Sequence, residues 1–308
     1  MLDIYHFSYG WLTPLLAYAM SFTGSLLGLQ CTARARTGQG RAGWLALAAV
    51  SIGGTGIWVM HFIAMLGFSI KGAQIRFDVP LTLLSALTAI VVVGLGLFLV
   101  ITPRPTLFAL LAGGTATGLG VGGMHYTGMY AMKTTATISY DMRLVVLSLV
   151  IAVVAATVAL WFTLRVRGFV PTIGAALIMA VAVCGMHYTG MSSMHAHHSG
   201  HHAAPSGVDG LQLLAPLIVA ISIVTMLLLI SISLTSIERD IELPPLRPPT
   251  LRPTGDDVAP PPIAKAPLLQ PVSTPIERPE PEQPDHWVGT DSPTTPYWPT
   301  TRPVPRRR

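Results

Sequence analysis

Long apolar runs constrain the fold of this chain more than any other feature. Seven runs of about 20 residues lie between the few charged residues of its first 235 positions. A helix of about 20 apolar residues crosses the hydrocarbon core of a bilayer. The sequence therefore predicts an all-α polytopic membrane protein with seven transmembrane helices. The runs cover residues 9–31, 43–69, 79–101, 107–132, 143–164, 170–194 and 211–235.

The charged residues support a membrane protein and argue against a soluble one. Only 11% of the residues are charged, against about 25% in soluble domains. The net charge of +5 does not indicate nucleic acid as a partner, because the basic residues lie in short loops and near the C-terminus. The first apolar run follows no basic segment and precedes no small-residue cleavage site, so we expect a first transmembrane span and not a removed signal peptide.

The loop charges predict the orientation in the membrane. The loops at 32–42, 102–106 and 165–169 carry six arginines and no acidic residue. The alternate loops carry lysine and arginine beside aspartate, or no basic residue at all. Loops rich in arginine and lysine stay on the cytoplasmic side. We therefore expect the N-terminus outside and the C-terminal tail in the cytoplasm.

The composition changes sharply near residue 236. Nineteen of the 26 prolines lie in the last 73 residues. A segment of this kind cannot bury a core and favours disorder with polyproline II character. The sequence thus predicts a membrane domain at 1–235 and a disordered proline-rich cytoplasmic tail at 236–308. The tail is either a docking segment for a proline-recognising partner or a solvated segment without one.

A short polar motif recurs inside this apolar sequence. "GGMHYTGM" occupies residues 122–129, "CGMHYTGM" occupies 184–191, and the related "WVMHFIAM" occupies 58–65. The three histidines are separated by 64 and then 62 residues, near the outer ends of the second, fourth and sixth spans. A repeat of this length indicates one helix pair used three times. The first six spans are therefore predicted to be three repeated helix hairpins.

The repeated motif favours a metal site. Each histidine is preceded by a methionine and followed four residues later by another, which lies on the same helix face. Imidazole and thioether form a soft donor set that suits copper, and no acidic residue lies within the spans. Small residues in the even-numbered spans predict close helix packing that would bring the histidines together. The candidate ligands are His61, His125, His187, Met60, Met124, Met186, Met65, Met129 and Met191.

Other residues near the motifs have open roles. Tyr126 and Tyr188, with the threonines that follow them, could orient the imidazoles by hydrogen bonding. Cys184 is either a further ligand or a small buried apolar residue. The tract "MHAHHSGHH" at 194–202 is either a weak metal-capture segment or a tolerant loop.

Several alternatives to a copper site remain at this stage. The histidines and methionines could simply pack in the helices, or two of the histidines could be the axial ligands of haem in a redox protein. A copper-handling protein without signalling is a further alternative. A transporter is disfavoured by the lack of acidic residues within the spans, and a retinal protein by the lack of lysine in 211–235. No nucleophile–base–acid set is present, so we expect no enzyme.

The motifs resemble those of the MHYT domain of bacterial integral-membrane sensors. The four-letter signature is intact at Met124–Thr127 and Met186–Thr189, and the resemblance extends over residues 9–235. It implies a sensor in the bacterial cytoplasmic membrane that binds copper and responds to a diatomic gas such as O₂, CO or NO. The resemblance implies that the copper ligands of this chain are His61, His125 and His187 with the methionines that precede them.

The chain departs from this family after its last span. Similar proteins often continue into cyclic di-GMP enzymes or DNA-binding domains, whereas only the proline-rich tail follows here. We therefore expect any signal to pass to a separate cytoplasmic partner at the tail.

Overall fold

Seven helices span the membrane domain in the computed structural model. The structure describes residues 2–37, 40–102, 104–197 and 205–241, so most of the predicted tail lies outside the described residues. Within the described part, seven helices are long and apolar enough to cross a membrane, which confirms the predicted number. They are α1 (Leu12–Ala35), the composite second span, α4 (Val79–Val100), α5 (Leu107–Ala131), α6 (Met142–Arg165), α7 (Phe169–Met191) and α8 (Gly210–Ile241).

The second span is the most irregular of the seven. It joins α2 (Arg41–Ala49), the π-helix η1 (Val50–Val59) and α3 (Met60–Leu66) without a break. A π-helix is rare and often lies beside a functional site. Here it precedes His61 and contains three glycines, of which Gly53 approaches α4 so closely that a Cβ there would lie 2.6 Å from the Ala89 carbonyl oxygen.

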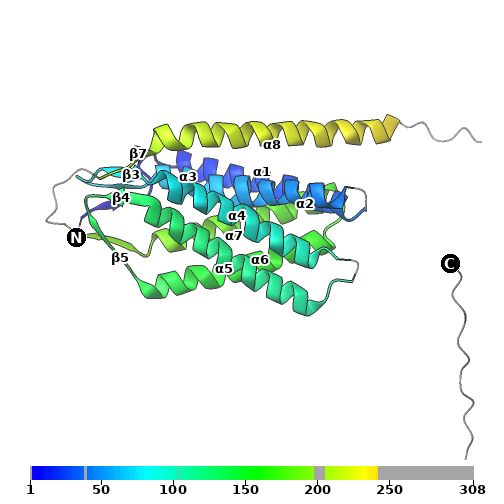
Figure 1. Cartoon of the computed structure of the whole chain (residues 1–308), viewed down its shortest axis with the longest axis horizontal. Helices are drawn as coiled ribbons and strands as arrows, with labels where there is room; N and C mark the ends of the chain where they lie inside the picture. Colours follow the sequence, from blue (N-terminus) through cyan, green and yellow to red (C-terminus); the bar gives the residue numbers. More distant parts are fainter. Residues whose placement is uncertain (1, 38–39, 103, 198–204, 242–308) are drawn as a thin grey trace, which may run out of the picture. The chain divides into compact units, whose positions relative to one another are not determined.

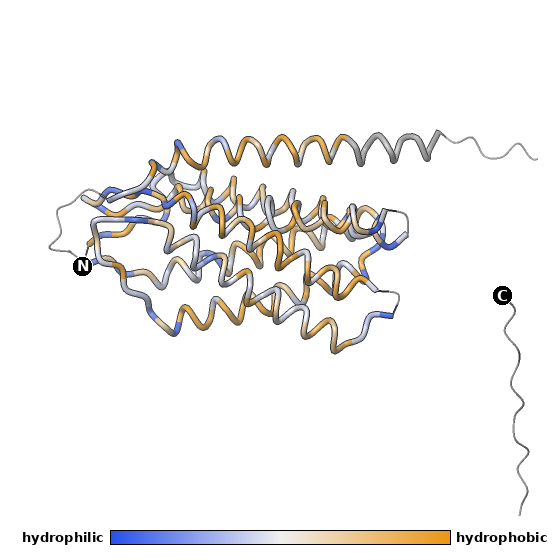
Figure 2. The backbone as a smooth tube through the Cα atoms, viewed as in Figure 1, coloured by the Kyte–Doolittle hydropathy of each residue, from blue (hydrophilic) through white to orange (hydrophobic). Residues whose placement is uncertain are grey.

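The first six spans form a closed ring. Each packs on the next along the chain, and α7 packs back on α1. Figure 1 views these helices from the side, with their axes roughly along the long axis of the picture. α8 lies outside this ring and packs mainly against η1. Large apolar side chains are exposed along α4, α6 and α8, as expected for surfaces that face lipid. In Figure 2 the polar residues gather at the two ends of the ring, while the helices between them are mostly apolar.

Short strands complete each repeat at one end of the ring, and the sequence reasoning did not foresee them. A strand precedes each odd-numbered span and another follows each even-numbered span, and the two strands of one repeat pair in antiparallel fashion. The pairs are β1 (Ile4–Tyr5) with β2 (Ser69–Ile70), β3 (Ile75–Phe77) with β4 (Met132–Thr134), and β5 (Thr137–Tyr140) with β6 (Met194–His197). Each repeat is therefore a β–α–α–β unit, and β7 (Val208–Asp209) adds to β3 ahead of α8.

The small residues of α5 do not act as predicted. Gly114, Gly118 and Gly122 face α6, where added Cβ atoms would lie 2.1–2.4 Å from atoms of that helix. Close packing therefore joins each span to its neighbours around the ring, and the even-numbered spans meet one another only sparsely. The histidines converge because the ring places three alternate helices around one axis.

Candidate metal centre

The three motif histidines meet at the strand-covered end of the ring. His61 lies in α3, His125 in α5 and His187 in α7, each within the last two turns of its helix. Each side chain is 1% exposed. The ring centroids are 4.8, 4.9 and 5.1 Å apart. The predicted convergence of the three histidines is confirmed.

One nitrogen of each imidazole points toward the other two rings. The Nδ1 atom of His61 lies 2.9 Å from Nδ1 of His187 and 3.1 Å from Nδ1 of His125. One potential metal-ligating atom from each ring lies within 4.8 Å of the others, so the triad could hold a metal ion.

Three neutral imidazoles cannot form full hydrogen bonds at all of these short Nδ1 contacts. A neutral imidazole has one N–H donor and one lone pair, so Nδ1 of His61 cannot form a full hydrogen bond with both neighbours at once. The Nε2 atoms of all three rings are buried and lack a hydrogen-bond partner. Buried polar atoms without partners are rare and costly. A cation that accepts the lone pairs of the three Nδ1 atoms would relieve the conflict at the centre of the triad.

The spacing of the three rings fits a small transition-metal ion. Metal–imidazole bonds of about 2.0–2.1 Å in tetrahedral geometry place the nitrogens roughly 3.3–3.4 Å apart. The observed Nδ1 separations of 2.9 and 3.1 Å need only a small outward shift of the rings to reach that value. Three imidazoles suit zinc or copper and leave a fourth position open.

Two glycines of the motifs shape the triad, a role that the sequence reasoning missed. A Cβ on Gly128 would lie 2.4 Å from Nε2 of His61, and a Cβ on Gly190 would lie 2.2 Å from Nε2 of His125. The outer edge of each of these two rings thus rests on the glycine of the next repeat. The signal was present, because glycine follows histidine by three residues in both complete motifs.

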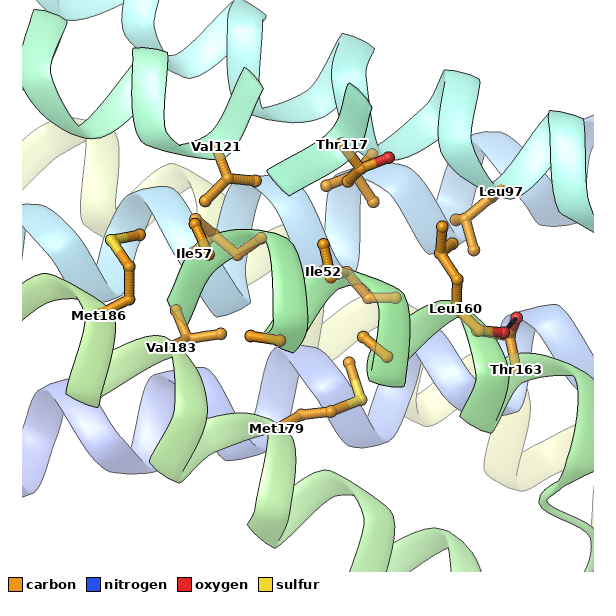
Figure 3. Close-up of a pocket in the computed structure, with 15 residues that line it drawn as sticks. Ile52, Ile57, Leu97, Thr117, Val121, Leu160, Thr163, Met179, Val183 and Met186 are labelled. Carbon is orange, nitrogen blue, oxygen red and sulfur yellow. Dashed lines mark hydrogen bonds between the residues drawn. The ribbon is translucent and has the colours of Figure 1, made fainter. Parts of the chain in front are cut away.

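The six candidate methionines are all buried, none more than 3% exposed. Met186 also lines an apolar cavity on the other side of the triad from the strands, where Figure 3 shows its thioether. Their role as ligands stays a prediction.

The tyrosines and threonines do not orient the imidazoles as expected. The Tyr126 hydroxyl bonds to the Ser148 hydroxyl at 2.6 Å, and the Thr189 hydroxyl donates to the Gly185 carbonyl at 2.7 Å. The Tyr188 hydroxyl has no hydrogen-bond partner. Cys184 is a free thiol.

The structure describes the first part of the histidine tract after α7. His195 and His197 belong to β6, which pairs with β5, and His197 Nε2 lies 3.1 Å from the Ser139 hydroxyl. The remaining three histidines of the tract lie outside the described residues.

The N-terminal segment covers the triad from the strand side. The His6 ring lies 5.7 Å from the Phe68 ring, and the Phe7 ring lies 5.6 Å from the Tyr188 ring. Partial burial lowers the pKa of His6, because it disfavours the charged imidazolium.

The apolar cavity begins one helical turn from the histidines. Ile57, Val121 and Val183 line it, and each lies four residues before a triad histidine. The cavity has a volume of about 50 Å³ and extends between η1, α4, α5, α6 and α7 as far as Leu160 and Thr163 (Figure 3). Apolar cavities of this kind stay dry and accept small apolar molecules.

Comparisons with known proteins connect the chain to membrane signalling. The bifunctional diguanylate cyclase/cyclic di-GMP phosphodiesterase MucR of Pseudomonas aeruginosa is 37% identical over 193 residues, which are 60% of this chain and 28% of MucR. The cyclic di-GMP phosphodiesterase NbdA of the same organism is 40% identical over 148 residues, 46% of this chain and 19% of NbdA. The signalling protein YkoW of Bacillus subtilis is 29% identical over 196 residues, 60% of this chain and 24% of YkoW.

The chain therefore spans less than a third of the length of these relatives. No solved structure matches it. Residues 54–113 and 118–176 match the family model of MHYT, described as a bacterial signalling protein N-terminal repeat. The first match contains His61 and the second contains His125. The multi-pass membrane domain of this chain therefore carries two MHYT repeats, the N-terminal repeat of bacterial signalling proteins.

Proposed function

We propose that the histidine triad binds one copper ion near the outer face of the bacterial cytoplasmic membrane, and that the domain senses a diatomic gas or a redox state there. The observation that carries the proposal is the convergence of three buried Nδ1 atoms, of which that of His61 cannot form a full hydrogen bond with both neighbours at once. When bound, copper would supply a redox couple and an open coordination position. The chain's own contribution is to hold the three imidazoles, exclude water and keep an apolar space beside them.

Copper is proposed over zinc because each triad histidine has methionine neighbours in the sequence. Met60, Met124 and Met186 each precede a triad histidine, and all are buried. Thioether sulfur suits Cu(I), whereas the usual protein ligands of zinc are thiolate, imidazole and carboxylate. The cavity of about 50 Å³ next to the triad supports a diatomic gas as the sensed molecule, because it is apolar and of suitable size.

The output is proposed to reach a separate cytoplasmic partner at the tail. The arginines at the end of the ring opposite the triad support an orientation with that end in the cytoplasm. The enzymatic activities in the names of MucR and NbdA belong to proteins of which this chain matches less than a third. We expect no catalytic activity from the membrane domain itself.

Metal content and an optical spectrum of the purified chain test the site. In all variants the five histidines at 195, 197, 198, 201 and 202 are replaced by asparagine, to remove surface capture. We expect about one copper per chain in this background and none after His61→Ala, His125→Ala and His187→Ala together. His6→Asn, in the segment that covers the triad, is a single-histidine control and should retain copper.

Two outcomes would contradict the proposal. A haem absorption band that disappears with the triad would assign the site to haem as a redox centre. Equal and negligible metal in the background protein and the triad variant, both still helical by circular dichroism, would leave the triad as a packing device.

The choice of copper has its own test. Replacing Met60, Met124 and Met186 by leucine conserves side-chain volume. We expect Cu(I) affinity to fall by about ten-fold or more, while zinc affinity stays unchanged. Equal effects on both metals would remove the thioethers from the ligand set.

A further inference from the structure

A basic pocket opens at the end of the ring opposite the triad. It has a volume of about 1060 Å³ and lies where the connections between spans one and two, three and four, and five and six come together. Four arginines line it: Arg36, Arg41, Arg165 and Arg167. Trp161, Leu107 and Leu110 supply an apolar part of the lining.

Two of the arginines are held in place by the ends of other helices. Arg36 donates to the Thr163 carbonyl oxygen at 3.1 Å, near the end of α6. Arg41 donates to the Ile101 carbonyl oxygen at the end of α4. A guanidinium has five N–H donors, so these bonds fix the two side chains and leave most of their donors for a ligand.

The positive charge of the pocket is not compensated by the four aspartates of residues 2–209. None of these aspartates forms an ion pair with the four arginines, because they lie in or beside the strands at the other end of the ring. Arg36 and Arg167 are close enough that burial and the neighbouring charge lower the pKa of Arg36. Like charges gathered in a concave site favour an anion.

We propose that this pocket binds the phosphate of an acidic phospholipid. Guanidinium groups bind phosphate through paired N–H donors, and basic pockets between transmembrane helices on the cytoplasmic side bind anionic lipid headgroups. The apolar part of the lining favours a lipid over a free anion, because only a lipid has acyl chains that can pack against it. Trp161 and Leu107, which are 44% and 71% exposed, can contact acyl chains beside the arginines.

Native mass spectrometry of the delipidated full chain in neutral detergent tests this assignment. Phosphatidylglycerol, phosphatidylcholine and pyrophosphate are the three probes. We expect phosphatidylglycerol to bind about ten-fold more tightly than phosphatidylcholine. Arg165→Gln with Arg167→Gln should remove this preference; both side chains are exposed, so the variant should fold.

The matched control is Arg34→Gln with Arg104→Gln, which removes the same charge at the same end but outside the pocket lining. This control should retain the preference for phosphatidylglycerol. If both variants lose the preference equally, the pocket is not the binding site, because the preference would then come from the overall positive charge of this end. If pyrophosphate binds more tightly than phosphatidylglycerol, the pocket is a site for free phosphate compounds, and the proposal of a lipid ligand is wrong. None of these outcomes depends on whether the triad holds copper.

Discussion

At the scale of residues, the repeated octapeptide supplies both residue types of one recurring contact, a histidine ring packed on a glycine. Its histidine reaches the centre of the triad, and its glycine receives the ring of the preceding repeat. The pairs are His61 with Gly128 and His125 with Gly190. The histidines could be predicted as a cluster from their spacing and depth. The glycine contacts could not, because the sequence does not say which helix faces which ring.

Replacing Gly128 by alanine tests this contact. The new methyl group would lie 2.4 Å from Nε2 of His61, so the ring or the helix must move. We expect a loss of roughly 1–3 kcal/mol in stability and weaker metal binding. Thermal unfolding and metal content of the purified variant measure both effects.

Gly123→Ala is the control for this substitution, because it lies in the same helix and has nothing within 4 Å of an added Cβ. It should change stability by less than about 1 kcal/mol. If the two variants unfold at the same temperature and bind the same amount of metal, the glycine does not position the triad.

At the scale of elements, the sequence predicted the spans well and their contacts poorly. Apolar length determined the seven helices, since a bilayer accepts little else. The strand pairs were missed because two to four residues leave no periodic pattern to detect. The glycines of α5 were assigned to the wrong neighbour, because small residues permit close packing without naming the partner helix.

The irregular second span gives a prediction at this scale. Gly53→Ala in η1 would place a Cβ 2.6 Å from the Ala89 carbonyl oxygen and push η1 from α4. We expect a loss of roughly 1–3 kcal/mol in thermal unfolding measurements. Gly54→Ala carries the same change in helix propensity but makes only ordinary contacts at 3.8 Å, so it should be nearly neutral. Equal stability of the two variants would show that the approach of η1 to α4 is not needed.

The cavity enclosed by the ring gives a second prediction. Ala156 of α6 lines it, and a leucine there would fill much of its 50 Å³. Small apolar cavities bind xenon, so ¹²⁹Xe NMR should detect binding to the unmodified chain and not to Ala156→Leu. Val154→Leu adds a methylene on an exposed face of the same helix and should retain xenon binding. If Ala156→Leu still binds xenon, the xenon site is not this cavity, and the cavity no longer supports access of an apolar gas to the triad.

At the scale of the whole molecule, the two ends of the ring differ in chemistry. One end carries strands, four aspartates and the covered histidine triad, and the other carries the arginine-lined pocket. The three repeats run parallel, because each crosses the membrane twice, so every motif histidine is at one end. This polarity suits a domain that senses on one side of the membrane and reports on the other.

The proposed orientation follows from that polarity and can be measured on single cysteines. Lys71 lies at the triad end with its side chain 69% exposed and paired with the equally exposed Asp3, and Arg104 is exposed at the other end. In intact cells, Lys71→Cys should react with a membrane-impermeant maleimide, and Arg104→Cys should react only after lysis, because arginine-rich loops stay in the cytoplasm. The unmodified chain is the control, since Cys31 is buried and Cys184 is half-buried. The reverse labelling pattern would place the triad at the cytoplasmic face, where it would sense the interior of the cell.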